Sequence, residues 1–263
     1  MNKIDKPKLR VGLAYDAFYV SFKKFFPELE IVRGNENLED FNLIIFPGGE
    51  DINPAFYKQK VTFSTGINDE RDRIELNIFR YCVYNKIKIL GVCRGHQLIN
   101  ALLGGDLVQD ITYDERVKSR HIHHEARHIL QDTCGKIGEI FSNVNSLHHQ
   151  GVISAGRGLK VTSSYRGIIE SCEGDNIITV QFHPEFMMES SSEIFFNKIR
   201  TWSKLGKTKP KEPLNKKIPF DVPSYTSYSF IEQDNPVRQE VRGWPPTPNR
   251  IMINENNRHN NEG

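Results

Sequence analysis

Residues 87–100, IKILGVCRGHQLIN, decide the fold of this chain. The apolar run 87–92 predicts a strand buried on both faces, and 94–103 predicts a helix. Cys93 stands where the two meet, between Gly91 and Gly95, an arrangement typical of a nucleophile elbow. Unpaired N–H groups at a helix N-terminus favour a thiolate. The pattern also fits a structural cysteine among glycines, so a base and an oxyanion site are needed to support catalysis.

The remaining sequence predicts an α/β fold with a mostly parallel central sheet flanked by helices. We expect strands at 10–15, 29–32, 42–46 and 87–92, and later, partly antiparallel strands at 159–164, 167–172 and 176–182. We expect helices near residues 18–25 and at 69–85, 94–103 and 191–204. Open α/β sheets bind ligands at the carboxyl ends of their strands. The residues that follow the strands are therefore the candidate site.

Two of these strand ends carry groups that complement Cys93. His183 follows the run 176–182, and Glu185, two residues on, could hold its imidazole in the right tautomer. Gly48 and Gly49 follow the strand 42–46 and offer N–H groups to an oxyanion, with the N–H of Arg94 as a second donor. Cys93, His183 and Glu185 together follow the logic of a catalytic triad.

The composition bounds the rest. With 263 residues and 38% hydrophobic content, we expect one catalytic domain at 1–205, a Lys/Pro-rich linker at 206–217 and an extended or partly disordered C-terminal arm at 218–263. The net charge of +2 is too small to indicate a nucleic-acid or membrane partner. The sequence shows no recognisable signal peptide or membrane span. The four cysteines read as thiols, so we expect a cytoplasmic protein. No P-loop motif is present.

Five motifs occur together: FPGGEDINP (46–54), NDERDRIELNIF (68–79), GVCRGHQLINALLGGDLVQDI (91–111), VNSLHHQGV (144–152) and VQFHPE (180–185). Over residues 10–204 the chain resembles the class I glutamine amidotransferases, with their flavodoxin-like glutaminase fold. It is most similar to their γ-glutamyl hydrolase branch, peptidase family C26, which includes γ-glutamyl-γ-aminobutyrate hydrolases. The segment before Phe46 is shorter than that branch leads us to expect, and the tail after Leu205 has no counterpart in the family.

The resemblance implies a cysteine amidohydrolase that forms a γ-glutamyl thioester and needs no cofactor or metal. It implies a triad of Cys93, His183 and Glu185 and an oxyanion hole from the backbones of Gly49 and Arg94. It also implies a substrate pocket that includes Gly48, Gln97 and His149. Arg71, Asp72 and Glu75 match a charged stretch of the hydrolase branch that either contacts substrate or supports the surroundings of the nucleophile.

Three functions remain open from the sequence. The first is a free hydrolase of glutamine or a γ-glutamyl amine. The second is the glutaminase subunit of an amidotransferase, with residues 206–263 docking on a separate synthetase or other protein. The third is a binding or regulatory protein on the same fold. His121, His123, His124 and His128 are interpreted as part of the site rim, with a metal site or plain surface as alternatives.

Overall fold

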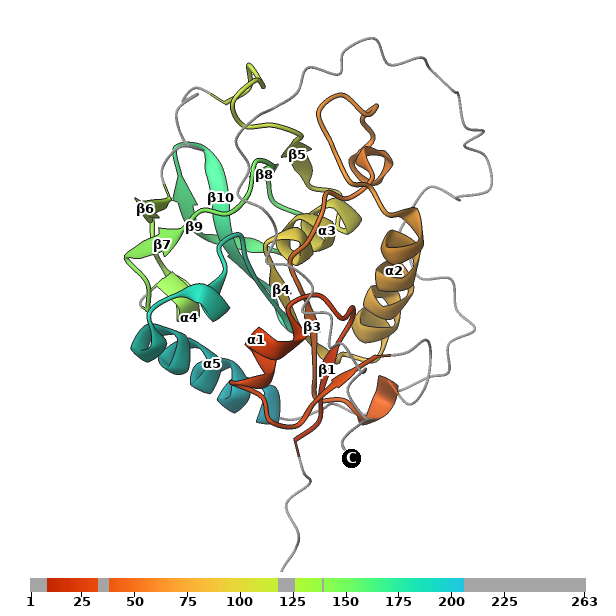
Figure 1. Ribbon diagram of the computed structural model, residues 1–263, viewed down its shortest axis with the longest axis vertical. Coiled ribbons are helices and arrows are strands. Elements are labelled where there is room, and N and C mark those ends of the chain that lie inside the picture. Colours follow the sequence, from red (N-terminus) through yellow and green to blue (C-terminus); the bar gives the residue numbers. More distant parts are fainter. Residues whose placement is uncertain (1–8, 33–37, 118–125, 139, 206–263) are drawn as a thin grey trace, which may run out of the picture. The chain divides into compact units, whose positions relative to one another are not determined.

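The computed structural model describes residues 9–32, 38–117, 126–138 and 140–205. The predicted linker and arm at 206–263 lie outside these ranges, so their organisation stays a prediction. Within the described residues, a nine-stranded sheet forms the centre of the domain (Figure 1). Its strands are β1 (Val11–Leu13), β2 (Leu29–Ile31), β3 (Leu43–Phe46), β4 (Lys88–Val92), β5 (Asp106–Val108), β8 (Gly151–Ser154), β9 (Lys160–Tyr165), β10 (Ile168–Glu173) and β11 (Ile177–Val180).

The strand order is β2-β1-β3-β4-β11-β10-β8-β5, with β9 paired to β10. Strands β2, β1, β3, β4 and β11 run parallel to one another, and β10, β8, β9 and β5 add antiparallel pairs. The predicted α/β fold with a mostly parallel central sheet is thereby confirmed. A separate hairpin pairs β6 (Arg127–Ile129) with β7 (Asn143–Asn145).

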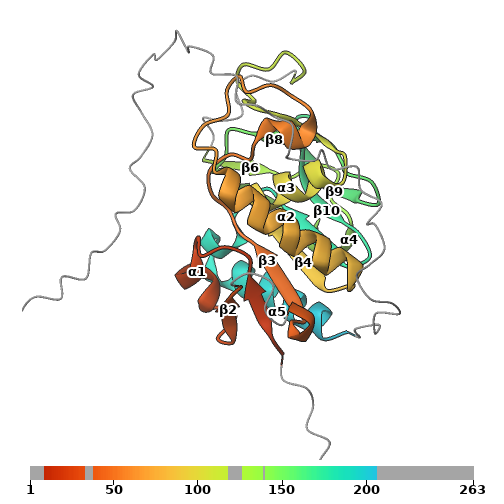
Figure 2. The ribbon, with the colours of Figure 1, turned by 90° about the vertical axis from the view of Figure 1, so that its right-hand side faces the viewer.

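Helices cover both faces of the parallel part (Figure 2). In β3, Ile44 and Phe46 pack in one core with helices α2 (Asp69–Tyr84) and α3 (Arg94–Leu102). Leu43 and Ile45 pack in the other core with α1 (Tyr19–Lys23) and α5 (Glu189–Lys204). Because successive strand residues point to opposite faces, a strand covered on both sides must be apolar throughout. This explains the unbroken LIIF run.

The remaining helical segments are short. They are α4 (Gly135–Gly138) and the 3-10 turns η1 (Leu38–Asp40), η2 (Pro54–Tyr57) and η4 (Pro184–Phe186). The turn η4 begins directly after His183, with Pro184 in its first position, where a missing N–H costs no hydrogen bond. No helix among the described residues is long and apolar enough to cross a membrane.

Candidate active site

The elbow around Cys93 is tightly built. Cys93 has a left-handed backbone (φ 51°) and caps α3, and its N–H donates to the carbonyl of Val180 at 2.8 Å. A Cβ atom added to Gly95 would lie 2.1 Å from the carbonyl oxygen of Phe46, and one added to Gly91 would lie 2.8 Å from the carbonyl oxygen of Gly95. Only glycine fits at these two positions. The strained turn places a thiol at the positive end of a helix.

His183 reaches Cys93 from the neighbouring strand. Strands β4 and β11 pair in parallel with Val92 opposite Val180, so both chains leave the sheet at the same edge. The thiol of Cys93 is hydrogen-bonded to the imidazole of His183, whose Nδ1 lies 2.7 Å from Glu185 Oε1. Nε2 is thus the ring nitrogen left to face the thiol. All three side chains are buried, and the structure brings together the three residues of the predicted triad.

The electrostatics of this trio favour a charged imidazole. Burial lowers the pKa of His183, but the negative charges of Cys93 and Glu185 and the hydrogen bonds to both raise it well above its ordinary value. The raised pKa favours a protonated imidazole placed between the sulfur of Cys93 and the carboxylate of Glu185. Such an arrangement sets a proton donor beside a potential nucleophile.

Asn145 fixes the backbone that carries the imidazole. Its side-chain amide donates to the carbonyl of His183 at 2.8 Å, and its side-chain oxygen accepts from the N–H of His183 at 2.8 Å. Ser192 adds a hydrogen bond to the carbonyl of Pro184 at 2.7 Å. His183 is therefore held by β7 and α5 as well as by its own strand.

The Gly48–Gly49 peptide is oriented by Arg71. The guanidinium donates to the carbonyl of Gly48 at 2.8 Å, and a Cβ atom on Gly49 (φ 147°) would lie 2.1 Å from Arg71 Nη1. In a planar trans peptide the C=O and the following N–H point in opposite directions. With its carbonyl turned to Arg71, this peptide turns the N–H of Gly49 away from that side chain, as an oxyanion donor requires.

Buried charges connect α2 to the elbow. The Arg94 guanidinium pairs with Asp72 and Glu75, while Arg71 Nε lies 3.3 Å from Glu75 Oε1. All four side chains are almost fully buried. Burial raises the pKa of Asp72 to about 6, although Arg94 opposes this shift. These residues support helix α3, which begins directly after Cys93, and the turn at Gly48.

Gln97 lies beside the elbow on α3 and links two other glutamines. Its amide donates to the carbonyl of Gln150 and to the side-chain oxygen of Gln181, each at 3.3 Å. Within the described part of the chain, Gln150 Oε1 and Gln181 Nε2 are buried without a hydrogen-bond partner. One acceptor and one donor are thus left over next to Gln97.

His149 lies between two carboxylates. Its Nε2 is 2.9 Å from Asp51 Oδ2 and its Nδ1 is 3.4 Å from Asp110 Oδ2. Burial lowers the pKa of His149, but the hydrogen bonds and charges of Asp110 and Asp51 raise it to about 9. His149 is therefore an imidazolium at neutral pH.

This pairing predicts a pH-dependent stability. Because the pKa of His149 is higher in the folded chain, its stabilising effect is complete below the unfolded value near 6.5 and is lost as pH rises through about 9. Across that window we expect the free energy of unfolding to fall by roughly 3 kcal/mol more in the parent chain than in His149→Gln. Urea denaturation at a series of pH values measures both curves. Parallel curves would contradict the charged pairing.

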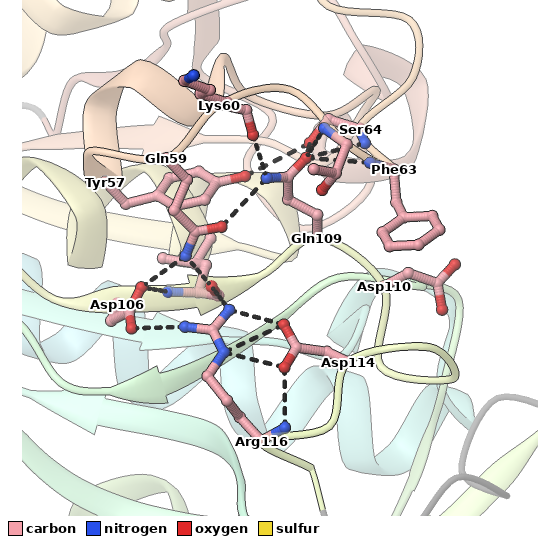
Figure 3. A network of polar contacts seen from close by, with 12 residues as sticks. Tyr57, Gln59, Lys60, Phe63, Ser64, Asp106, Gln109, Asp110, Asp114 and Arg116 are labelled. Atoms are coloured by element: carbon pink, nitrogen blue, oxygen red, sulfur yellow. Dashed lines mark hydrogen bonds and ion pairs between the residues drawn. The ribbon is translucent and has the colours of Figure 1, made fainter. Parts of the chain in front are cut away.

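Gln109 fixes the loop that follows η2 (Figure 3). Its side-chain oxygen accepts from the N–H groups of Thr62, Phe63 and Ser64, and its amide donates to Lys60 and Gln59. The same loop reaches the candidate pocket, because Ser64 Oγ accepts from Gln150 at 2.8 Å and the N–H of Thr65 donates to Asp51 at 2.8 Å. One buried glutamine thus holds a wall of the site in place.

Other candidates lie elsewhere. His128 is buried on β6, where it stacks on Tyr165 and lies 3.2 Å from Glu170, so the prediction that it belongs to the site rim is not supported. His121, His123 and His124 lie outside the described residues. Among the residues that the structure describes, no three His, Cys, Asp or Glu side chains are placed so that they could hold a metal ion. Cys82 and Cys172 are core thiols whose pKa burial raises.

The sequence did not predict roles for four residues that support the candidate site: Asp51, Gln109, Asp110 and Asn145. Each nevertheless lies inside or next to one of the quoted motifs. Their roles depend on pairings across the fold, such as Asn145 with His183, that no spacing within one motif reveals. The available signal was their membership in motifs that already held candidate residues.

Comparison with known proteins gives the family. The peptidase C26 family model matches residues 27–185. A glutamine amidotransferase-like protein of Rickettsia prowazekii is 28% identical over 213 residues, covering 61% of this chain and 76% of the relative. A glutamine amidotransferase-like protein of Lactococcus lactis is 32% identical over 184 residues, covering 64% and 77%.

A crystal structure from Thermoplasma acidophilum, of a protein named as a GMP synthase component, shares the fold with a TM-score of 0.53 and 16% identity, covering 74% of this chain and 98% of that one. The family match spans more than half of the 263 residues and includes the elbow, the histidine and the carboxylate. This chain therefore belongs to the peptidase C26 family and is a glutamine amidotransferase-type hydrolase.

Proposed function

We propose that the protein hydrolyses a γ-glutamyl amide, either glutamine or a γ-glutamyl amine, through a γ-glutamyl thioester on Cys93. The observation that carries this proposal is the buried contact of the elbow thiol with His183, itself held by Glu185 at 2.7 Å. The free thiols of the described cysteines fit a reducing compartment such as the cytoplasm.

The first half of the reaction uses the charged pair. The Cys93 thiolate attacks the γ-carbonyl carbon, and the N–H groups of Gly49 and Arg94 stabilise the oxyanion. The His183 imidazolium then donates its Nε2 proton to the leaving nitrogen as the C–N bond breaks. The amine departs and the γ-glutamyl group remains bound to sulfur as a thioester.

The second half reverses the role of the imidazole. Neutral His183 takes a proton from water, which attacks the thioester carbonyl in the same oxyanion site. The C–S bond breaks, glutamate leaves, and the thiolate–imidazolium pair is restored. Glu185 keeps its hydrogen bond to Nδ1 throughout and stabilises the charged ring.

The glutamyl head needs partners for an ammonium and a carboxylate. We assign these to the groups around Gln97, where Gln150 Oε1 and Gln181 Nε2 are the buried acceptor and donor without partners in the described chain. Gly48 and His149 complete the proposed pocket. His149 connects it to the carboxylates of Asp51 and Asp110.

The role of Glu185 is testable by Glu185→Gln. Loss of its charge lowers the pKa of His183, so we expect kcat to fall about 100-fold and the alkaline limb of kcat/KM to move to lower pH. Glutamate release from a panel of γ-glutamyl amides measures the effect. Glu189→Gln, an exposed carboxylate at the start of α5, is the matched control. An unchanged pH profile in Glu185→Gln would contradict the assignment.

A second candidate function is a glutaminase subunit that supplies ammonia to a separate synthetase. The observation that favours it is the length of chain beyond the family match, which ends at residue 185 of 263. In this proposal, residues 206–217 form a linker and 218–263 a docking arm. Full glutaminase activity in a chain cut at residue 205, with no partner copurifying with the intact chain, would exclude it.

A further inference from the structure

Two aromatic rings flank the imidazole of His183. The ring of Phe18 meets it edge-on at 5.5 Å between centroids, and the ring of Phe186 stacks on it at 5.4 Å. Phe18 and Phe186 also contact each other at 5.6 Å. Both remain partly open to solvent, with 37% and 42% of their surface exposed. The base is thus buried, while the rings beside it are not.

Gly48 shows on which side of the imidazole Phe18 lies. A Cβ atom on Gly48 would lie 2.6 Å from His183 Cε1 and 3.1 Å from Phe18 Cε2. The edge of Phe18 therefore meets the same backbone that leads into the oxyanion donor Gly49. The ring borders the place where the amide bond would be cleaved.

The backbone of Phe18 is also unusual. Its φ of 57° is left-handed, a conformation that is costly for a bulky side chain and that occurs preferentially at functional sites. This backbone conformation holds a large apolar ring in a partly exposed position. Burial of the ring alone therefore does not explain why Phe18 adopts a left-handed backbone.

We propose that Phe18 and Phe186 bind the amine half of the substrate, and that this half is a primary amine with an aromatic or extended apolar substituent. This inference rests on the proposed function. His183 gives its Nε2 proton to the leaving nitrogen, so a substituent on that nitrogen starts within a hydrogen-bond length of the imidazole. It must then pass the groups beside the imidazole, which include these two rings.

The aromatic character of Phe18 and Phe186 determines which substituent we expect on the amine. Aromatic faces and edges attract other rings and apolar chains in stacked or edge-on contacts. Ammonia, the leaving group of glutamine, is too small to contact them. A γ-glutamyl amide of an amine with an aromatic substituent carries a ring that is large enough to contact them.

The test compares kcat/KM for glutamine, γ-glutamylethylamide and γ-glutamylbenzylamide. In the parent chain we expect the benzyl amide to be preferred over glutamine by about tenfold, with the ethyl amide between them. The substitutions Phe18→Leu and Phe186→Leu should each remove most of the preference for the benzyl amide over glutamine. Phe18→Tyr keeps the ring and should retain that preference. Phe25→Leu is the control, because Phe25 stacks on Phe196 at 4.2 Å instead of on the imidazole.

The outcomes separate this inference from the proposed function. If glutamine is hydrolysed and Cys93 reacts with a glutamine-mimicking electrophile, but the benzyl amide is not preferred, only this inference fails. It also fails if the leucine variants slow all three substrates by the same factor, because the rings then only support His183. If no substrate is turned over and Cys93 does not react, the proposed function fails first.

Discussion

Cys93→Ala is expected to abolish amide hydrolysis, with kcat falling by at least about 10⁴-fold. The proposed thioester needs a sulfur atom, and Cys93 supplies it at the N-terminus of α3 beside His183. The fold should survive, since alanine keeps the Cβ atom at this buried position. Steady-state kinetics and thermal unfolding of the same preparation measure the two quantities.

The other thiols provide the control for this prediction. Cys134 is half-buried and its Sγ lies 3.8 Å from the carbonyl oxygen of Val161, so Cys134→Ala should retain full activity. A glutamine-mimicking electrophile, mapped by mass spectrometry, should label Cys93 and leave Cys82 and Cys172 unmodified, because burial raises the pKa of both core thiols. Activity that survives in Cys93→Ala would exclude the thioester route.

Arg94→Met is expected to destabilise the fold by about 3–5 kcal/mol. The substitution leaves Asp72 without its guanidinium partner in a fully buried position and weakens the support of Glu75. Even with Arg94 in place, burial raises the pKa of Asp72 to about 6, so without it we expect a protonated carboxyl at neutral pH. For a domain of this size the melting temperature should drop by about 10 °C.

The matched control is Arg116→Met. Arg116 also pairs with two carboxylates, Asp106 and Asp114, but its side chain is 42% exposed, so we expect a change below about 1 kcal/mol. The double variant Asp72→Asn/Arg94→Met replaces the unpartnered carboxyl with an amide that needs no protonation and should regain a part of the lost stability. Chemical denaturation compares the four chains. Equal stability of Arg94→Met and the parent chain would contradict the role of the network.

Long apolar runs made the centre of the fold predictable from the sequence. Strands β3 and β4 and helices α2, α3 and α5 begin and end within about two residues of their predicted bounds, because their periodicity and helix-start signals are unambiguous. Strands β5, β6, β7 and β8 were missed. Each has only three or four residues and depends on pairing with a distant partner, so local pattern carries little information about it.

For the candidate site, the sequence predicted that three side chains come together but not which groups hold them. The predicted contact of Cys93 with His183 and Glu185 is found in the structure, because parallel pairing of β4 and β11 brings the two strand ends together. The sequence left open whether Arg71, Asp72 and Glu75 contact substrate or support the surroundings of Cys93. The buried pairing of the two carboxylates with Arg94 fits the second interpretation. The sequence did not predict the two hydrogen bonds between Asn145 and the backbone of His183, because they depend on how a separate hairpin meets the sheet.

The pairing of β4 with β11 also bears on when the enzyme becomes active as it is made. A ribosome translates Cys93 90 residues before His183, which follows only near the end of the predicted catalytic region. Until β11 inserts beside β4, the nascent chain carries a helix-terminal thiol with no imidazole. We therefore expect activity to begin only when β11 pairs with β4. Contacts between strands so far apart in the sequence form slowly.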